Sequence, residues 1–416
     1  MGIVNNYKWR IFQSAFKQGA NLVIFLMSAK VLGHYDFGLY NYSLAIVLFM
    51  GTMADFGISL SSKRFIAEFY HLDKNKMLLV LWNSFLAIFS VSSLIFIVIL
   101  IFGDFFVGSS LQNILILAPL IFLVPLSALY DGLFMGQSKF REMALSSFFS
   151  AIISIPLAYI LLKNIGLTGA LISQVCFYLF AVISSAIFYG KFKVKFNGEI
   201  LKKIIKYSVL IGIANVGYFL YARIGVFMLG SFGYFEEIGY FELANKIYTL
   251  AVIPFALMGN VLSPAIISMK LSAPLEVLRV RFKNVLKYTL ISSLVVSFSV
   301  FLIIPTAISF VLPSYFGSEF MITLGIFLTF MPLAIVDTLV SIGFIVPTGK
   351  VKTSSVIVVL GVLLNIVLNY FFIPLWGYVG VVTSTAIVYN LAAVLKIVFF
   401  YRQSFSNPSV IDVERV

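Results

Sequence analysis

Charged residues are scarce in this sequence. Asp, Glu, Lys and Arg together fill 11% of its 416 positions, whereas a water-soluble domain carries about 25%. Hydrophobic residues fill 61%, and the mean hydropathy is +1.06. Such a chain has too little polar surface to face water on all sides, which excludes soluble enzymes, secreted domains and disordered regulators. We therefore expect an integral membrane protein.

Cysteine and histidine are also scarce. Cys176 is the only cysteine, so the chain cannot form an internal disulfide. The two histidines, His34 and His71, fall in different predicted connections, which argues against a Cys/His metal site. The longest polar connection, 268–286, is far shorter than the roughly 50 residues that a catalytic or ATP-hydrolysing domain needs. We expect no cofactor, no metal and no enzymatic activity.

Long apolar stretches are abundant instead. Each is close to the roughly 20 residues that a helix needs to cross a bilayer, and none alternates as a barrel strand does. The stretches are 10–32, 39–62, 77–102, 113–136, 143–163, 168–190, 207–231, 239–267, 287–312, 320–346, 355–373 and 379–401. The sequence therefore predicts an all-α integral membrane protein with about 12 transmembrane helices.

Lys and Arg gather on one side of these predicted spans. Of the 29 basic residues, 24 fall on the side of both termini, and the opposite connections hold none. Those connections contain acidic residues instead: Asp36, Asp104, Glu236, Glu237 and Glu319. Because basic connections stay in the cytoplasm, we expect a multi-pass protein of the cytoplasmic (inner) membrane with both termini cytoplasmic. The net charge of +13 is spread over short connections, which argues against nucleic acid as a partner.

The two halves of the sequence carry glycines at matching places. Gly38 matches Gly239 at a separation of 201 residues, and a separation of 211 relates Gly132 to Gly343 and Gly166 to Gly377. Six spans per half give both halves the same orientation, so we expect parallel six-helix lobes, 1–200 and 201–416. The basic segment 191–206 joins them, and within it 199–206 predicts a helix on the cytoplasmic surface.

The residues around the second predicted span form a characteristic pattern. Leu32-Gly33 is followed by Phe37-Gly-Leu-Tyr40, by Asp55-Phe-Gly57 and by Arg64-Phe-Ile-Ala-Glu68, and Gly136-Gln-Ser-Lys-Phe-Arg141 follows the fourth span. In these motifs and in its twelve spans the sequence resembles the polysaccharide-transport family of the multidrug/oligosaccharidyl-lipid/polysaccharide exporter superfamily. That family includes flippases for O-antigen and capsule repeat units.

The resemblance implies an architecture and a function. It implies two lobes around a central cavity that opens alternately to each side of the membrane. It also implies translocation of an undecaprenyl-pyrophosphate-linked oligosaccharide repeat unit for cell-surface polysaccharide biosynthesis. The implied partners are the lipid-linked glycan, membrane lipids and other polysaccharide-assembly membrane proteins. The motifs do not identify the glycan.

Cations inside two predicted spans are candidates for substrate binding, because a charge in the bilayer is costly unless it faces protein or a wet cavity. Arg223 and Lys246 lie at a similar depth, about 10 Å below the outer face. Together they predict a cationic zone that attracts a pyrophosphate or an acidic sugar. In the alternative, Glu242 neutralises Lys246 one turn away, while Arg223 binds backbone carbonyls or extends outward.

Four further ionisable residues lie nearer the cytoplasmic end of their spans. Asp337 is a candidate for binding a coupling proton or sodium ion, because a buried carboxylate suits that task. The alternative is structural pairing, in which Asp337 or Asp55 pairs with Lys396. For Asp131 we expect Lys139 or Arg141 as the partner.

Polar and aromatic residues complete the predicted cavity wall. Lys17, Gln18 and Asn21 share roughly one face of the first span, and Tyr218 on the seventh could stack on a sugar. Hydrogen bonding between helices and ordinary packing are the alternatives for these residues and for Asn365 and Asn369.

Three other functions compete with the flippase. A multidrug exporter of the same superfamily is expected to carry a carboxylate in the middle of the first span, where this sequence has Lys17, Gln18 and Asn21. A lipid II flippase is excluded only weakly. A membrane-embedded glycan polymerase or ligase would need a large outer loop, and the longest here, 103–112, is short.

Overall fold

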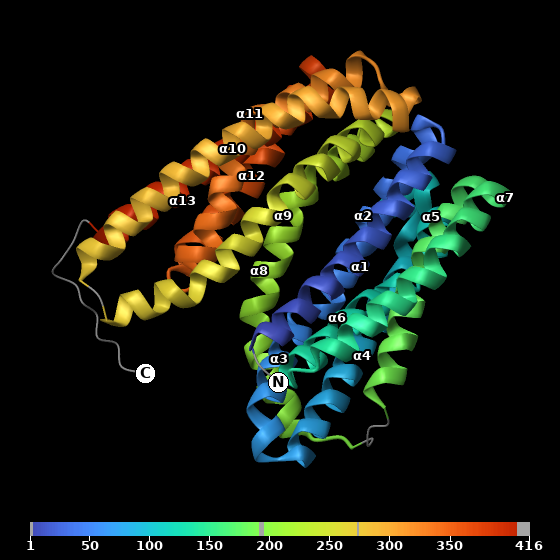
Figure 1. Cartoon of the computed structure of the whole chain (residues 1–416). Helices are drawn as coiled ribbons and strands as arrows, with labels where there is room; N and C mark the ends of the chain where they lie inside the picture. The colour runs from blue at the N-terminus through green and yellow to red at the C-terminus, as the bar shows by residue number, and fades with distance from the viewer. Residues whose placement is uncertain (1–2, 191–194, 273, 406–416) are drawn as a thin grey trace. The chain divides into compact units, whose positions relative to one another are not determined.

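A computed structural model describes residues 3–190, 195–272 and 274–405, and within these ranges the chain is helical, without strands (Figure 1). The chain divides into two compact units, Met1–Leu220 and Tyr221–Val416. Ten of the described helices are long and apolar enough to cross a membrane. The prediction of an all-α, multi-pass membrane protein is thus confirmed.

Unit 1 begins with α1 (Ile3–Val31), α2 (His34–Asp55), the short α3 (Ile58–Leu72) and α4 (Lys74–Val107). A 3-10 turn (Gly108–Ser110) then leads into α5 (Leu111–Leu117), α6 (Leu120–Gly136) and α7 (Phe140–Tyr189). The helix α8 (Gly198–Ser231) contributes its residues up to Leu220.

Unit 2 holds the rest of α8, followed by α9 (Phe235–Ser272) and α10 (Leu275–Val311). After a 3-10 turn (Pro313–Tyr315) come α11 (Ser318–Val340), a π-helical turn (Ser341–Ile345), α12 (Val351–Trp376) and α13 (Tyr378–Phe405).

The twelve predicted spans map onto these helices. The 50-residue α7 contains two of them, because its backbone leaves the helical region at Ile165 and Gly166, inside the predicted connection 164–167. Gly166 has a φ of +52°, which suits glycine best. The first span corresponds to α1, which is not among the ten apolar helices because it also carries basic residues such as Lys17.

Three expected boundaries were wrong. The predicted span 39–62 ends early, because Phe56 and Gly57 adopt left-handed backbone angles that separate α2 from α3. The connection expected at 268–286 is nearly all helix, since α9 runs to Ser272 and α10 starts at Leu275. The surface helix expected at 199–206 is the beginning of α8 rather than a separate element. The predictions for 268–286 and 199–206 were wrong because the helices continue in polar turns beyond their apolar stretches.

Apolar side chains pack the helices within each unit. In unit 1, α1 packs on α7 through Ala20, Ile24 and Phe177, while Ile66 and Ile204 belong to a second cluster that joins α3, α4, α6 and α8. In unit 2, clusters around Phe282 and Met331 join α9, α10, α11 and α13. These clusters hold the helices that carry the charged residues described below.

The break between α2 and α3 packs tightly against α8. A Cβ atom at Gly212 would lie 2.5 Å from the Phe56 carbonyl oxygen, and one at Gly57 would lie 2.7 Å from the Gly212 nitrogen. Distances below 3 Å to backbone force a shift of the chain. Only glycines allow this crossing, which fixes the first part of α8 on unit 1.

This crossing gives a stability prediction. Gly212→Ala should lower the free energy of unfolding by about 1–3 kcal/mol, because the added methyl overpacks a backbone contact. Thermal unfolding of the detergent-solubilised protein measures the change. Gly19→Ala is the matched control, since a Cβ there meets no atom within 4 Å. Equal stability of the two variants would contradict the tight crossing.

The predicted orientation can be tested by thiol labelling. In a Cys176→Ser background, single cysteines at Asp36, Asp104 and Glu319 should react with a membrane-impermeant reagent in intact cells, because their connections lack basic residues. Cysteines at Lys74, Lys195 and Lys352 should react only after the membrane is opened. Labelling of the second group in intact cells would refute the proposed orientation.

Candidate functional site

Three ion pairs join different membrane helices in the described part of the chain. They are Lys17–Asp131 in unit 1, and Arg223–Glu242 and Asp337–Lys396 in unit 2. The other described ion pairs join residues three positions apart on one helix or at its start. The interhelical pairs therefore locate the charged groups that a translocated anion or a coupling ion could use.

The pair in unit 1 links α1 to α6. The Lys17 Nζ atom lies 2.7 Å from Asp131 Oδ2 and donates a 3.3 Å hydrogen bond to Ser127 Oγ. Both charged side chains keep some exposure, 26% for Lys17 and 20% for Asp131. The pairing expected between Asp131 and Lys139 or Arg141 was wrong, because these residues lie beyond the end of α6, where the Lys139 ammonium rests over the Tyr189 ring.

The neighbours of Lys17 differ in their surroundings. Asn21 donates to the Lys17 carbonyl oxygen at 3.1 Å, one turn back along α1, while the Gln18 side chain is exposed. The structure thus brings Lys17 and Asn21 together and leaves Gln18 on another side of the helix.

The first pair in unit 2 links α8 to α9. An Arg223 Nη1 donates to Glu242 Oε1, with Glu242 buried and the Arg223 side chain 29% exposed. The alternative in which Arg223 binds backbone carbonyls or extends outward was wrong, because packing of α8 on α9 supplies a carboxylate. Lys246 lies half-buried one turn further along α9, and Tyr218 is 42% exposed on the part of α8 that belongs to unit 1.

Aromatic rings hold the helix around Arg223 in place. Tyr221 and Tyr389 stack with centroids 4.5 Å apart, and the Tyr389 hydroxyl donates to the Tyr221 carbonyl oxygen at 3.2 Å. The Tyr389 ring also meets Phe330 edge-on at 5.2 Å. Because α8, α11 and α13 meet at these rings, the arginine projects from a fixed backbone.

The second pair in unit 2 links α11 to α13. Lys396 Nζ lies 2.8 Å from Asp337 Oδ2, and Ser341 donates to the other oxygen at 3.1 Å. Lys396 is only 4% exposed. The expected partnership of Asp337 with Lys396 is therefore confirmed. Asp55 instead caps the start of α3, accepting from the Gly57 and Ser59 backbone nitrogens.

The two asparagines on α12 also form bonds inside unit 2. Asn369 donates to Asn365 at 2.7 Å and accepts from Ser384 on α13, and all three side chains are buried. For these residues, hydrogen bonding between helices is the alternative that the structure supports. Among the described residues, no group of three or more His, Cys, Asp or Glu could hold a metal ion.

Sequence reasoning missed one feature of the repeat. Tyr178 and Tyr389 are separated by 211 residues, the same separation that relates the later glycine matches. Tyr178 packs against the cluster that includes Ala20 and Ile24 of α1, the first helix of unit 1, and Tyr389 stacks on Tyr221 of α8, the first helix of unit 2. The constant separation in the sequence was the available signal for this correspondence.

Comparison with known proteins agrees with this fold. The inward-facing structure of a multidrug resistance MATE family transporter of the MOP superfamily is 17% identical, with 95% of each chain covered and a TM-score of 0.79. The lipid II flippase MurJ in an inward closed conformation is 16% identical, with 94% of this chain and 87% of that chain covered and a TM-score of 0.74. A MOP superfamily transporter from Pyrococcus furiosus is 16% identical, with 96% and 95% covered and a TM-score of 0.64.

These similarities establish the fold over nearly the whole length, and the fold is one used by transporters and flippases. A search of curated protein sequences finds no match. The family model described as "Polysaccharide biosynthesis protein" matches residues 3–270, which is well over half of the chain. The chain therefore belongs to this polysaccharide biosynthesis family.

Proposed function

We propose that the protein is a flippase that translocates an undecaprenyl-pyrophosphate-linked oligosaccharide repeat unit across the cytoplasmic membrane by alternating access. The translocated unit serves the biosynthesis of cell-surface polysaccharide. The observation that carries this proposal is the family match over residues 3–270 on a chain that has the fold of MOP transporters over nearly its whole length. In this proposal the glycan is carried, not chemically changed.

Arg223 is the proposed contact for the pyrophosphate. Glu242 occupies one Nη atom of the guanidinium, and an arginine has five N–H donors, so donors remain for a ligand. The Arg223 side chain is 29% exposed. Because the pair is neutral overall, its attraction for phosphate oxygens rests on directed, charge-assisted hydrogen bonds rather than on net charge. Lys246 lies on α9, one turn after Glu242, and adds a positive charge to that part of the helix.

Lys17 is the proposed counterpart in unit 1. Its ammonium is shared between Asp131 and Ser127, and it remains partly exposed. Gln18, Asn21 and Tyr218 are proposed to supply sugar contacts in the same conformational cycle. An ammonium has three N–H donors, so Lys17 can donate to a phosphate oxygen while it keeps its bonds to Asp131 and Ser127.

Asp337 is the proposed site of ion coupling. Its ion pair with Lys396 is largely buried, so protonation of the carboxylate or binding of sodium would have to release the lysine. Such a release changes the interaction between α11 and α13. Movement of these helices would link the ion gradient to the transport cycle.

Two other transported substrates are compatible with the fold, since its solved relatives include a multidrug transporter and a lipid II flippase. Lys17 in the first helix favours an anionic cargo over a cationic drug. Deletion of the gene in its own host distinguishes the three. A repeat-unit flippase predicts loss of surface polysaccharide with a lipid-linked repeat unit accumulating on the inner leaflet. Drug sensitivity alone would favour the exporter, and lysis with accumulated lipid II would favour the lipid II flippase.

The role of Arg223 can be separated from its ion pair. Arg223→Gln combined with Glu242→Gln removes both charges and leaves no buried charge unpaired. This double variant should reach the membrane in normal amount and restore less than about a tenth of the surface glycan in the deletion strain, because it lacks charge-assisted phosphate contacts.

Arg223→Lys serves as the comparison, since it keeps the pair with Glu242 but supplies a single point charge. It should retain intermediate activity. Normal transport by the abundant double glutamine variant would show that the Arg223–Glu242 pair only stabilises the fold.

The Asp337–Lys396 pair gives a second prediction. Asp337→Asn leaves the buried Lys396 without a carboxylate, which should destabilise the protein by about 3–5 kcal/mol and reduce its amount in the membrane. Adding Lys396→Gln should restore the amount, as measured by quantitative immunoblotting. Lys30→Gln, an exposed lysine at the end of α1, is the control and should change neither quantity.

Transport by the restored double variant then tests coupling. If Asp337 binds the coupling ion, the double variant should be abundant yet slow. Full transport by it would restrict Asp337 to a structural role.

A further inference from the structure

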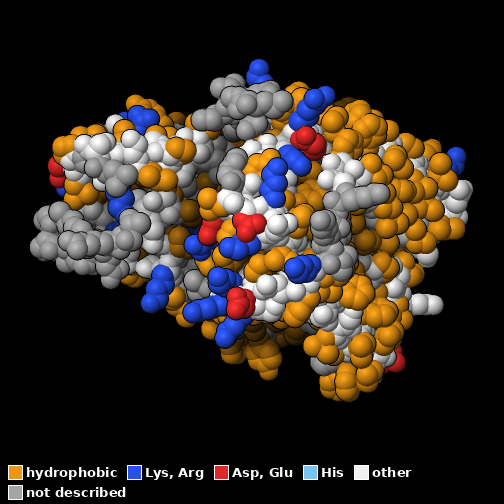
Figure 2. Space-filling model, turned by 90° about the horizontal axis from the view of Figure 1, so that it is seen from below, with side chains coloured by type: hydrophobic (Ala, Val, Ile, Leu, Met, Phe, Trp, Pro, Cys, Tyr) orange, Lys and Arg blue, Asp and Glu red, His pale blue; other side chains and the backbone are white. Residues whose placement is uncertain are grey.

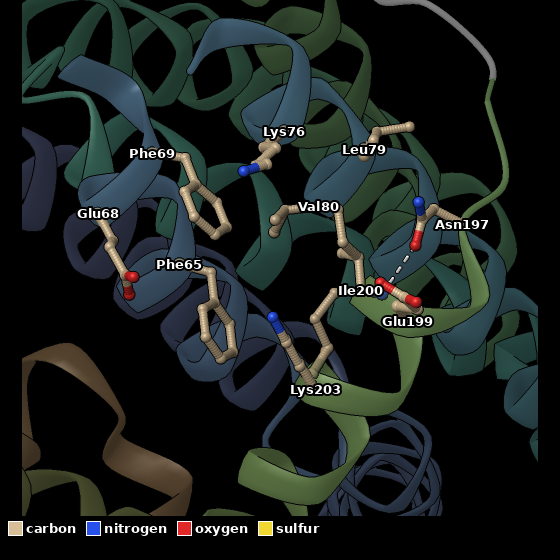
Figure 3. Close-up of a pocket in the computed structure, with 11 residues that line it drawn as sticks. Phe65, Glu68, Phe69, Lys76, Leu79, Val80, Asn197, Glu199, Ile200 and Lys203 are labelled. Atoms are coloured by element: carbon tan, nitrogen blue, oxygen red, sulfur yellow. Dashed lines mark hydrogen bonds between the residues drawn. The ribbon is translucent and has the colours of Figure 1, made fainter. Parts of the chain in front are cut away.

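Unit 1 contains a pocket of about 300 Å³ where α3 meets the beginnings of α4 and α8 (Figure 3). Its apolar wall is made by Phe65 and Phe69 on one side and by Val80 and Ile200 on the other. The volume lies at the lower end of the range for small-molecule sites, roughly 300–1,000 Å³. The pocket can therefore take a compact polar group with a short apolar portion, but not a pair of lipid chains.

Charged side chains of both signs surround this apolar wall. Figure 3 shows the ammonium groups of Lys76 and Lys203 directed into the space between the phenyl rings and the aliphatic side chains. Glu68 and Glu199 flank the pocket from opposite ends. Within the described residues, Lys203 and the two glutamates form no ion pair, and Lys76 has only a 3.8 Å contact with the exposed Asp73. The pocket thus offers two cations and two anions to a ligand.

The walls of the pocket are firmly built. Asn197 caps α8 by accepting from the Ile200 nitrogen at 3.0 Å, and its own backbone nitrogen donates to Asn83 of α4 at 3.1 Å. Ser61 of α3 donates to the Ile204 carbonyl oxygen at 3.2 Å. These bonds hold α3, α4 and α8 together, so the four charged residues project from a preformed frame.

The beginnings of two membrane-capable helices lead us to place the pocket near the boundary between membrane and water. Both α4 and α8 are membrane-capable helices, and both begin at the pocket. Figure 2 shows basic side chains gathered on the face of the molecule seen from below, with a few acidic ones among them. A membrane lipid presents its polar headgroup at this level, while its chains remain in the bilayer.

We propose that this pocket binds the headgroup of a zwitterionic aminophospholipid, of the phosphoethanolamine class. Lys76 and Lys203 bind the phosphate, and a flanking carboxylate, Glu68 or Glu199, accepts from the primary ammonium. The glycerol portion packs on Phe65, Phe69 and Ile200. A purely anionic headgroup would leave both carboxylates beside negative charge, and a choline headgroup has no N–H to donate to them. The two cations and two anions of the pocket therefore favour a headgroup that contains both a phosphate and a primary ammonium.

Native mass spectrometry of the purified full-length protein tests this proposal. The protein is delipidated in detergent and titrated with phosphatidylethanolamine, phosphatidylcholine and phosphatidylglycerol of identical chains. Phosphatidylethanolamine should form the most abundant one-lipid complex in an equimolar mixture. Lys203→Ala should weaken it about tenfold through loss of a charge-assisted hydrogen bond. Glu199→Gln together with Glu68→Gln should abolish the preference over phosphatidylcholine.

Lys206→Ala is the matched control, because Lys206 is an exposed lysine on the same helix that does not line the pocket. It should bind like the unmodified protein. Preference for phosphatidylglycerol, equal binding of all three lipids, or equal effects of Lys203→Ala and Lys206→Ala would each overturn the proposal. The exposed glutamates can be changed without disturbing the core, so the test stands even if Lys203→Ala folds poorly. None of these outcomes depends on which cargo the protein transports.

Discussion

A charge inside a bilayer must meet an opposite charge, a hydrogen-bonding group or water, and this requirement organises the interior of both units. In unit 1 it ties α1 to α6 through Lys17 and Asp131, and in unit 2 it ties α8 to α9 and α11 to α13. Apolar packing alone gives helices in lipid little reason to choose one neighbour over another, because the lipid chains are just as apolar. The ion pairs favour particular pairs of neighbouring helices. In the proposed function they also supply the polar groups that contact the cargo.

Most of the fold could be predicted from the sequence because the bilayer imposes a length and a composition on each span. The connection at 164–167 was located because Lys163, Asn164 and Gly166 interrupt the apolar run, and the structure has non-helical backbone there. The end of the second span was missed, because Phe56 and Gly57 turn the chain inside a stretch that hydropathy alone does not divide. Hydropathy reports where a helix is apolar and does not report where it starts or stops in water, which is why 268–286 was mistaken for a loop.

The site was predicted less completely, and for a definite reason. Charged residues inside the predicted spans stand out in the sequence, because a charge in the bilayer is energetically costly. Their partners, however, depend on which helices touch. The sequence left Asp337 and Asp55 as alternative partners of Lys396, and the structure pairs Lys396 with Asp337. Asp131 was not paired correctly, because its partner Lys17 is more than a hundred positions away, on a helix that only the fold brings close. The alternative for Arg223 was backbone carbonyls or an outward orientation, because the sequence does not show that α8 packs Arg223 against Glu242 of α9.

The division of α8 between the two units determines how two separately made fragments of the chain would associate. Residues 198–220 follow the connection between the halves, yet they pack on unit 1 through Gly212, Ser208 and Ile204. A chain cut between Tyr189 and Gly198 would therefore yield a second fragment that still carries part of the core of the first. Co-expressed halves would have a built-in docking segment for each other, and a first fragment made alone would expose the groove that α8 normally fills.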